Sequence, residues 1–185
     1  MPNTYNFFSK GCIFNNHYAN AEWTLPSLAT IFTGNYTHNH GLFHPFKRHV
    51  IGEDQHILSE LFQNKGYLTF QAGSPRRANP NYGYCKGFDR IIFHPEVDCD
   101  QVVSDFFDHN RSFKNRDQFN WISFCNIHHF LKLNPPITSQ VDLPINYLFN
   151  EENKQKVKSV FEPYSELKTK IFIHELKRID FYLGQ

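Results

Sequence analysis

Four apolar residues near the start of the chain share the spacing of one buried helical face. They stand at positions i, i+3, i+4 and i+7 and are Leu25, Leu28, Ala29 and Phe32. Gly34 follows where a left-handed residue would end such a helix. The pattern therefore predicts a short helix over residues 25–33, with Thr24 as its N-cap. Pro26 falls in the first turn, where its missing N–H costs nothing.

A second helix is predicted over residues 54–65, where Asp54 serves as the N-cap and Gly66 as the stop. Its apolar face consists of Ile57, Leu58, Leu61 and Phe62. Apolar residues then occupy every second position of residues 67–72, which indicates a strand. A helix that leads directly into a strand is typical of a layered α/β fold.

The rest of the chain predicts further elements of the same kind. A glycine- and proline-rich loop is expected over residues 73–87, a helix around residues 102–107 and a buried strand over residues 121–127. A long C-terminal helix is expected to end at Gly184. Its apolar face consists of Phe172, Leu176, Ile179 and Leu183. Together these elements predict one α/β domain over residues 1–185.

Composition and charge narrow the class of protein. Apolar side chains make up 40% of the 185 residues and aromatic ones 17%, which suffices for a core. Lysine and arginine number 19 against 18 aspartates and glutamates, so there is no positive field to attract nucleic acid, and we expect no such partner. No apolar run is long enough to span a membrane, and no secretory signal is recognisable. We therefore take the cytoplasm as the default compartment.

Cysteine and histidine residues do not suggest a metal site on their own. The cysteines are far apart, form no Cys-x-x-Cys pair and are predicted to be reduced thiols. They are Cys12, Cys85, Cys99 and Cys125. The histidines His38, His40 and His44 stand close together but have no carboxylate neighbour, so we expect loop and packing roles for them.

Candidate chemistry lies at the start of the first predicted helix. The hydroxyl of Thr24 would stand beside backbone N–H groups at the positive end of the helix dipole, which favours a bound phosphate or sulfate. The alternative is that Thr24 only caps the helix, since threonine is a common N-cap. The Thr-Gly and His-Gly pairs that follow in register favour the catalytic interpretation.

This segment resembles the nucleophile segment of the sulfatases, a family within the alkaline phosphatase superfamily. The residues that carry the resemblance are Thr24, Pro26-Ser27, Thr33-Gly34 and His40-Gly41. Weaker similarity extends over nearly the whole chain, and the match is most specific over residues 19–41. The resemblance implies an alkaline-phosphatase-like layered sheet with flanking helices, which is incomplete here. It also implies a hydrolase or transferase that acts on sulfate or phosphate esters, with a small-molecule, glycan or lipid-headgroup substrate.

The resemblance also implies roles for particular residues. Thr24 takes the place of the nucleophile and of one ligand to a divalent metal, which would be calcium, magnesium, manganese or zinc. Ser27 takes a substrate-binding position. His128, which follows the strand predicted over residues 121–127, would steady the substrate or protonate the leaving group. For His128 the alternative of a core histidine at a strand end stays open.

Several departures from the family pattern limit what can be carried over. The lysine that usually follows the middle strand is missing, because Ser74-Pro75 comes next, and we assign its positive charge and a substrate-binding role to Arg76 or Arg77. Family sulfatases convert a cysteine or serine to formylglycine, and Thr24 is neither, so we do not expect formylglycine. A threonine here resembles the superfamily's phosphohydrolases and phosphotransferases, which form a covalent phosphothreonine.

The family's metal ligands lie in acidic segments that this sequence does not contain. In the family pattern, an acidic pair lies before the part that this sequence matches. An Asp-His or Asp-Asn pair lies after that part. We therefore expect this chain alone to have little or no turnover. The alternatives are a phosphoethanolamine- or phosphoglycerol-type transferase of the same superfamily, a non-catalytic remnant that binds anions, and a truncated product without an independent role.

Overall fold

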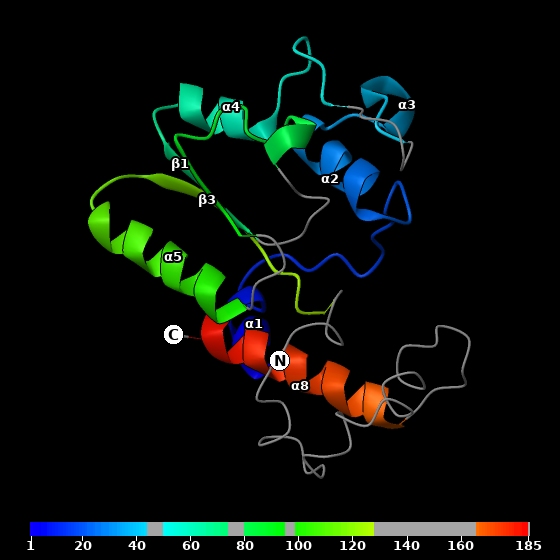
Figure 1. The fold of residues 1–185 in the computed structure, drawn as a ribbon, viewed down its shortest axis with the longest axis vertical. Coiled ribbons are helices and arrows are strands. Elements are labelled where there is room, and N and C mark those ends of the chain that lie inside the picture. The colour runs from blue at the N-terminus through cyan, green and yellow to red at the C-terminus, as the bar shows by residue number, and fades with distance from the viewer. Residues whose placement is uncertain (44–49, 74–79, 95–98, 128–165, 185) are drawn as a thin grey trace. The chain divides into compact units, whose positions relative to one another are not determined.

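The computed structural model describes residues 1–43, 50–73, 80–94, 99–127 and 166–184 (Figure 1). The chain divides into two compact units. The first consists of Met1–Ile13, Val97–Cys99 and Cys125–Gln185, and the second of Phe14–Glu96 and Asp100–Phe124. The expectation of a single domain over residues 1–185 stays a prediction.

The second unit holds a parallel sheet of three strands. They are β1 (Leu68–Gly73), β2 (Arg90–Phe93) and β3 (Gln118–Ser123), in the order β2-β1-β3. Phe70 of β1 pairs with Arg90 on one side and with Asn120 on the other. Parallel strands need a crossover, and α5 (Cys99–Ser112) lies in the connection from β2 to β3. The predicted α/β architecture is therefore confirmed.

Helix α2 (Thr24–Thr33) anchors the core of this unit. The apolar stripe predicted for it is buried at Leu25, Ala29 and Phe32, with Leu28 partly buried beside them. The other buried members of the core are Leu42, Ile51, Ile57 and Tyr84. The Phe32 ring lies 4.7 Å from that of Trp121 on β3, centroid to centroid, so the helix is fixed to the sheet. Two short elements also belong to this unit: α3 (Thr37–His40) and the 3₁₀ helix η2 (Pro80–Tyr82).

Helix α4 (Leu58–Asn64) begins later than predicted. Asp54 is exposed and is not its N-cap, so the expected start of this helix at residue 54 is wrong. The physical reason is that Glu60, in the first turn, accepts a hydrogen bond from the backbone N–H of Ile57 at 3.0 Å. This satisfies one of the N–H groups that a helix start leaves open. Gly66, with a φ of 87°, follows the helix end as expected.

The first unit contains α1 (Pro2–Phe8) and α8 (Glu166–Leu183), which lie side by side (Figure 1). The Asp180 carboxylate accepts hydrogen bonds from the backbone N–H groups of Asn3 and Thr4, at 3.2 and 2.9 Å. Burial alone would raise the pKa of Asp180, but hydrogen bonds from Thr4 and Asn3 outweigh it and lower that pKa. The predicted C-terminal helix is confirmed, and its carboxylate caps α1.

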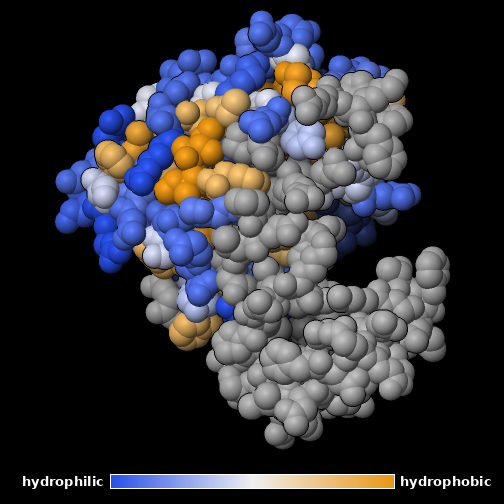
Figure 2. Space-filling view, in the orientation of Figure 1, coloured by the Kyte–Doolittle hydropathy of each residue, from blue (hydrophilic) through white to orange (hydrophobic). Residues whose placement is uncertain are grey.

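Hydrophobic side chains also reach the surface. On the face drawn in Figure 2 they gather in a patch in the region of the sheet, with polar side chains around it. Phe172 and Leu183 of α8 are exposed, so described residues cover the predicted apolar face of this helix only in part. Among the helices in the described ranges, none has both the length and the apolar character needed to cross a bilayer. The four cysteines form no disulfide with one another, and their reduced state stays a prediction.

His109 of α5 is a titratable group inside the second unit. Its ring is fully buried and stacks on Phe70, with 4.0 Å between the centroids. Neither ring nitrogen has a hydrogen-bond partner among the described residues. Burial, and after it the positive charge of Arg90, lowers the pKa of His109 from its ordinary value of 6.5. His109 therefore serves as a neutral aromatic ring between α5 and the sheet.

This burial predicts a pH-dependent stability. Below about pH 6.5 the unfolded state binds a proton at His109 that the folded state resists, so the free energy of unfolding should fall as the pH drops. Urea denaturation at about pH 7.5 and pH 5.5 should show a smaller loss for His109→Phe than for the wild type. The comparison is needed because burial also lowers the pKa of His40 and His174. Equal losses in the two proteins would rule out this role for His109.

Candidate functional site

Thr24 is the first residue of α2 rather than its N-cap. The N-cap is Trp23, whose backbone is extended with φ −140° and ψ 165°, so the predicted N-cap is wrong by one position. The Thr24 hydroxyl has no hydrogen-bond partner within the ranges that the structure describes. The interpretation of Thr24 as a mere helix cap therefore lacks the hydrogen bond that would define it.

The surroundings of Thr24 combine a partly open side chain with unpaired backbone donors. Thr24 is half-buried, whereas Leu25 is only 1% exposed. Neither the Thr24 nor the Leu25 N–H has an acceptor among the described residues, and Pro26 has no N–H. The Ser27 N–H reaches only the Trp23 carbonyl, at 3.4 Å. Two backbone donors thus accompany the hydroxyl at the positive end of α2.

The direction of α2 places this turn at one end of the sheet. Figure 1 shows that α2 runs opposite to β1 and β3, so its first turn lies toward the end where these strands finish. Ligand sites of open α/β sheets lie outside the carboxyl ends of the strands. The position of Thr24 fits this rule.

Two hydrogen bonds hold the first turn in place. The Tyr84 hydroxyl donates to the Leu25 carbonyl at 2.6 Å, and the Ser27 hydroxyl donates to the Ala21 carbonyl at 2.9 Å. Burial raises the pKa of Tyr84, so its hydroxyl stays protonated and keeps donating. The only hydroxyl proton of Ser27 is used in its bond. Substrate binding by Ser27 stays a prediction, and the bond itself fixes the loop before Thr24.

The Thr-Gly and His-Gly pairs have structural roles. Gly34 and Gly41 have φ of 67° and 70°, the left-handed conformation that ends α2 and α3. His40 is buried, and its Nδ1 accepts the Leu42 N–H at 3.1 Å. Its Nε2 therefore carries the proton and donates to the Thr30 hydroxyl at 3.2 Å. Burial lowers the pKa of His40, which keeps the ring neutral. The predicted packing role of His40 is confirmed.

The described residues do not supply a set of ligands for the divalent metal that the resemblance implies. In the part of the chain that the structure describes, no three His, Cys, Asp or Glu side chains come together in a way that could hold a metal ion. Thr24 offers a single hydroxyl oxygen, whereas hard divalent ions take six or more oxygen ligands and zinc about four ligands. The described residues therefore do not form a metal site by themselves.

Three predicted site residues lie outside the described residues. They are Arg76, Arg77 and His128. Their roles stay predictions. Sequence reasoning missed Tyr84, which lies inside the stretch predicted as a loop. The only local signal is the flanking pair of glycines, Gly83 and Gly87, which have φ of 93° and 66° and so mark a tightly constrained segment.

Comparisons with known proteins bear on the fold and the family of this chain. The model of the family described as Sulfatase matches residues 1–169. A search of curated proteins found no match. Among solved structures, BT4656 in complex with its substrate D-glucosamine-2-N,6-O-disulfate matches with a TM-score of 0.60 and 16% sequence identity. The match covers 99% of this chain and 55% of that one, so this chain spans about half the length of its neighbour. At this identity the likeness concerns the fold, and the family match decides the assignment: the chain belongs to the sulfatase family.

Proposed function

We propose that this chain carries the nucleophile of a sulfatase-family hydrolase or transferase, and that the nucleophile is the Thr24 hydroxyl. The observation that carries the proposal is the first turn of α2. A partly open hydroxyl without a described hydrogen-bond partner stands there beside the unpaired N–H groups of Thr24 and Leu25. Family membership supports the reaction class, which is attack on a sulfate or phosphate ester.

The proposed step forms one bond and breaks one. The Thr24 oxygen attacks the sulfur or phosphorus atom, the bond from that atom to the ester oxygen breaks, and the alcohol leaves with a proton. The backbone N–H groups at the start of α2 stabilise the anionic oxygens. Tyr84 and Ser27 contribute by holding the turn through their bonds to Leu25 and Ala21. Water or an alcohol then takes the group from Thr24.

The described residues supply only part of the catalysis that such a reaction needs. A helix terminus stabilises an anion by at most about 2 kcal/mol. One acid or base adds about 10²- to 10⁴-fold, which is roughly 3 to 5 kcal/mol. Enzymes usually lower barriers by about 8 to 23 kcal/mol. Because the described residues contain no group of three or more side chains that could hold a metal ion, we expect little or no turnover from this chain alone.

An assay of the purified chain tests this expectation. Aryl phosphate and aryl sulfate would be offered with calcium, magnesium, manganese or zinc salts, and release of the phenol followed. We expect rates close to those of the salts alone. Robust metal-dependent turnover that disappears in Thr24→Ala would overturn the expected inactivity and support the nucleophile. Metal-dependent turnover that survives in Thr24→Ala would contradict the nucleophile.

The nucleophile's identity favours phosphate chemistry as a second candidate. Thr24 cannot be converted to formylglycine, as a cysteine or serine can. Its hydroxyl oxygen can instead attack phosphorus directly and form a phosphothreonine. A transferase would pass that group to an alcohol such as glycerol or ethanolamine instead of water. The product distinguishes the two, since a transferase yields the new phosphate ester and a hydrolase yields inorganic phosphate. Sulfated or phosphorylated sugars are the substrates to try first, given the sulfated sugar of BT4656.

A further inference from the structure

Three polar side chains share the face of the sheet on which α2 packs. Trp121 of β3 belongs to this face, because its ring lies 4.7 Å from that of Phe32 on α2, centroid to centroid. Gln71 of β1 is the register partner of Trp121, and Ser123 follows Trp121 by two residues. Register partners, and residues two apart on one strand, point to the same side of a sheet. Gln71, Trp121 and Ser123 therefore all lie on the α2 face.

Each of these side chains carries a buried polar atom that is not paired. The atoms are Oε1 of Gln71, Nε1 of Trp121 and Oγ of Ser123, and none has a hydrogen-bond partner among the residues that the structure describes. Gln71 as a whole is only 3% exposed. Native proteins pair nearly all such atoms, either with protein groups or with ordered water. Three of them on one face of two neighbouring strands therefore indicate a common partner.

The Ser123 hydroxyl points across the sheet toward β1. Gly73 is the register partner of Ser123, and a Cβ at Gly73 would collide with Ser123 Oγ. The absence of a side chain at Gly73 therefore makes room for this hydroxyl. Gln71 precedes Gly73 by two residues on the same face, so the hydroxyl and the amide oxygen lie along one strip between β1 and β3.

The donor and acceptor character of the three atoms matches water. Trp121 Nε1 only donates, Gln71 Oε1 only accepts, and the Ser123 hydroxyl does both. A cation would leave the indole N–H unpaired, and an anion would leave the amide oxygen unpaired. Water both donates and accepts, and a buried water typically makes about three hydrogen bonds.

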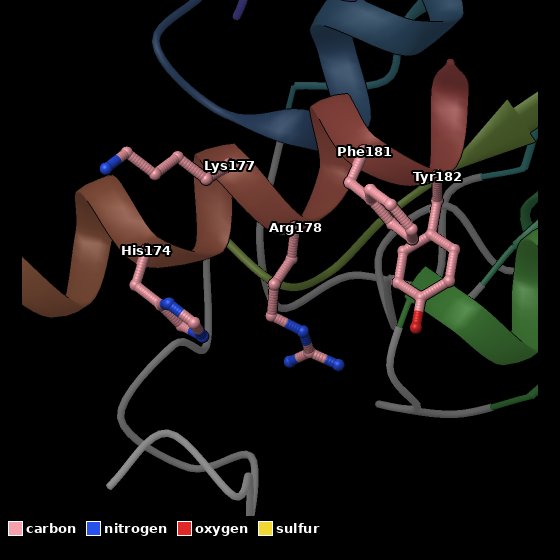
Figure 3. A pocket seen from close by; sticks show the side chains of 5 residues that line it. All are labelled: His174, Lys177, Arg178, Phe181 and Tyr182. Atoms are coloured by element: carbon pink, nitrogen blue, oxygen red, sulfur yellow. The ribbon is translucent and has the colours of Figure 1, made fainter. Parts of the chain in front are cut away.

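The polar side chains at α8 spread in different directions instead. They line a cavity of about 440 Å³, together with Phe181 and Tyr182. Figure 3 shows Lys177 extending away from His174 and Arg178, and Arg178 Nη1 already donates to Glu175 at 3.2 Å. This cavity therefore lacks groups that converge on one ligand.

We propose that a water molecule is held on the α2 face of the sheet by Gln71, Trp121 and Ser123. The water accepts a hydrogen bond from the indole N–H, donates one to the Gln71 oxygen and shares one with the Ser123 hydroxyl. It joins β3 to the central strand β1 and holds the Trp121 ring against Phe32. The proposal does not depend on the role of Thr24.

Water NOE spectroscopy of the full chain with ¹⁵N-labelled tryptophan tests the proposal. The chain has two tryptophans, Trp23 and Trp121, so Trp121→Phe assigns both indole signals. We expect a cross-peak from the Trp121 indole proton to water, with the sign of a water that stays bound while the protein tumbles. A rotating-frame spectrum excludes proton exchange as its source. A wild-type Trp121 indole without this cross-peak would overturn the proposal.

A double-mutant cycle provides a second test, by urea denaturation. Gln71→Leu and Ser123→Ala should each lower the folding equilibrium constant by about fivefold, the size of one typical hydrogen bond. Together they should lower it by less than the product of the two effects, since both act through one water. Ser112→Ala is the control, because its exposed hydroxyl donates to the Asp108 carbonyl on α5, and its effect should simply multiply with that of Gln71→Leu.

Two outcomes of this cycle would contradict the water site. If Gln71→Leu is more stable than the wild type, the amide oxygen is unpaired and its removal relieves a cost. If the effects of Gln71→Leu and Ser123→Ala simply multiply, the two side chains share no partner.

Discussion

Dinitrophenyl phosphate should label Thr24 in preference to every other hydroxyl of the chain. This ester has a good leaving group, so it needs less catalysis than an ordinary substrate, and correct placement of the nucleophile has a large effect. Well-oriented groups react with effective concentrations of about 10⁵ M or more. The adduct, a phosphothreonine, would be located by intact mass and peptide mapping after long incubation. Thr24→Ala should abolish the label, whereas Thr24→Ser should retain it.

Thr33 provides the matched control for this labelling. It is a threonine at the opposite end of α2, and its hydroxyl donates to the Ala29 carbonyl at 2.7 Å. Thr33→Ala should therefore keep the label at Thr24. A label distributed over many hydroxyls, or one that persists in Thr24→Ala, would contradict the placement of the nucleophile.

Phe32→Ala should cost about 3 to 5 kcal/mol of unfolding free energy, the typical loss for a buried aromatic side chain. The Phe32 side chain is 2% exposed. Its ring contacts those of Tyr84, Phe88 and Trp121 at centroid distances of 5.5, 6.1 and 4.7 Å. Truncation would leave a cavity between α2 and the sheet. Typical domains have a free energy of unfolding of only about 5 to 15 kcal/mol. This loss would therefore leave the second unit with little net stability.

Ile31 is the control for this substitution because it neighbours Phe32 on α2 and is 53% exposed. Ile31→Ala should change the unfolding free energy by no more than about 0.5 kcal/mol. Urea denaturation followed by circular dichroism measures both variants. Similar losses at the two positions would mean that the α2 stripe does not face the core as described.

Sequence patterns predicted the helices and strands well where the spacing of apolar residues matches the face that packs on the core. The i, i+3, i+4, i+7 stripe identified α2 because these residues face one core. The start of α4 was missed because Asp54 is a good cap in isolation, whereas Glu60 makes the hydrogen bond that the structure contains. The strand expected at residues 121–127 begins at Gln118, since pairing with β1 sets its limits and the apolar run does not.

The candidate site was predictable to the extent that it is local. Thr24 and the glycines that end α2 and α3 lie within one short segment, so their spacing carries the information. Tyr84 was not predictable, because its hydrogen bond to Leu25 joins residues 59 positions apart. His109 likewise gave no signal, because stacking on Phe70 depends on how α5 crosses the sheet.

The central claim is that the first turn of α2 receives a tetrahedral anion beside the Thr24 hydroxyl. Titration of the isotope-labelled chain with inorganic phosphate and sulfate, followed by amide NMR, tests it most directly. The account predicts saturable shifts of the Thr24 and Leu25 N–H signals, while the Gly34 N–H, which is bonded to the Thr30 carbonyl at 2.9 Å, stays unchanged. Thr24 and Leu25 signals that do not move, or that move no more than that of Gly34, would contradict it.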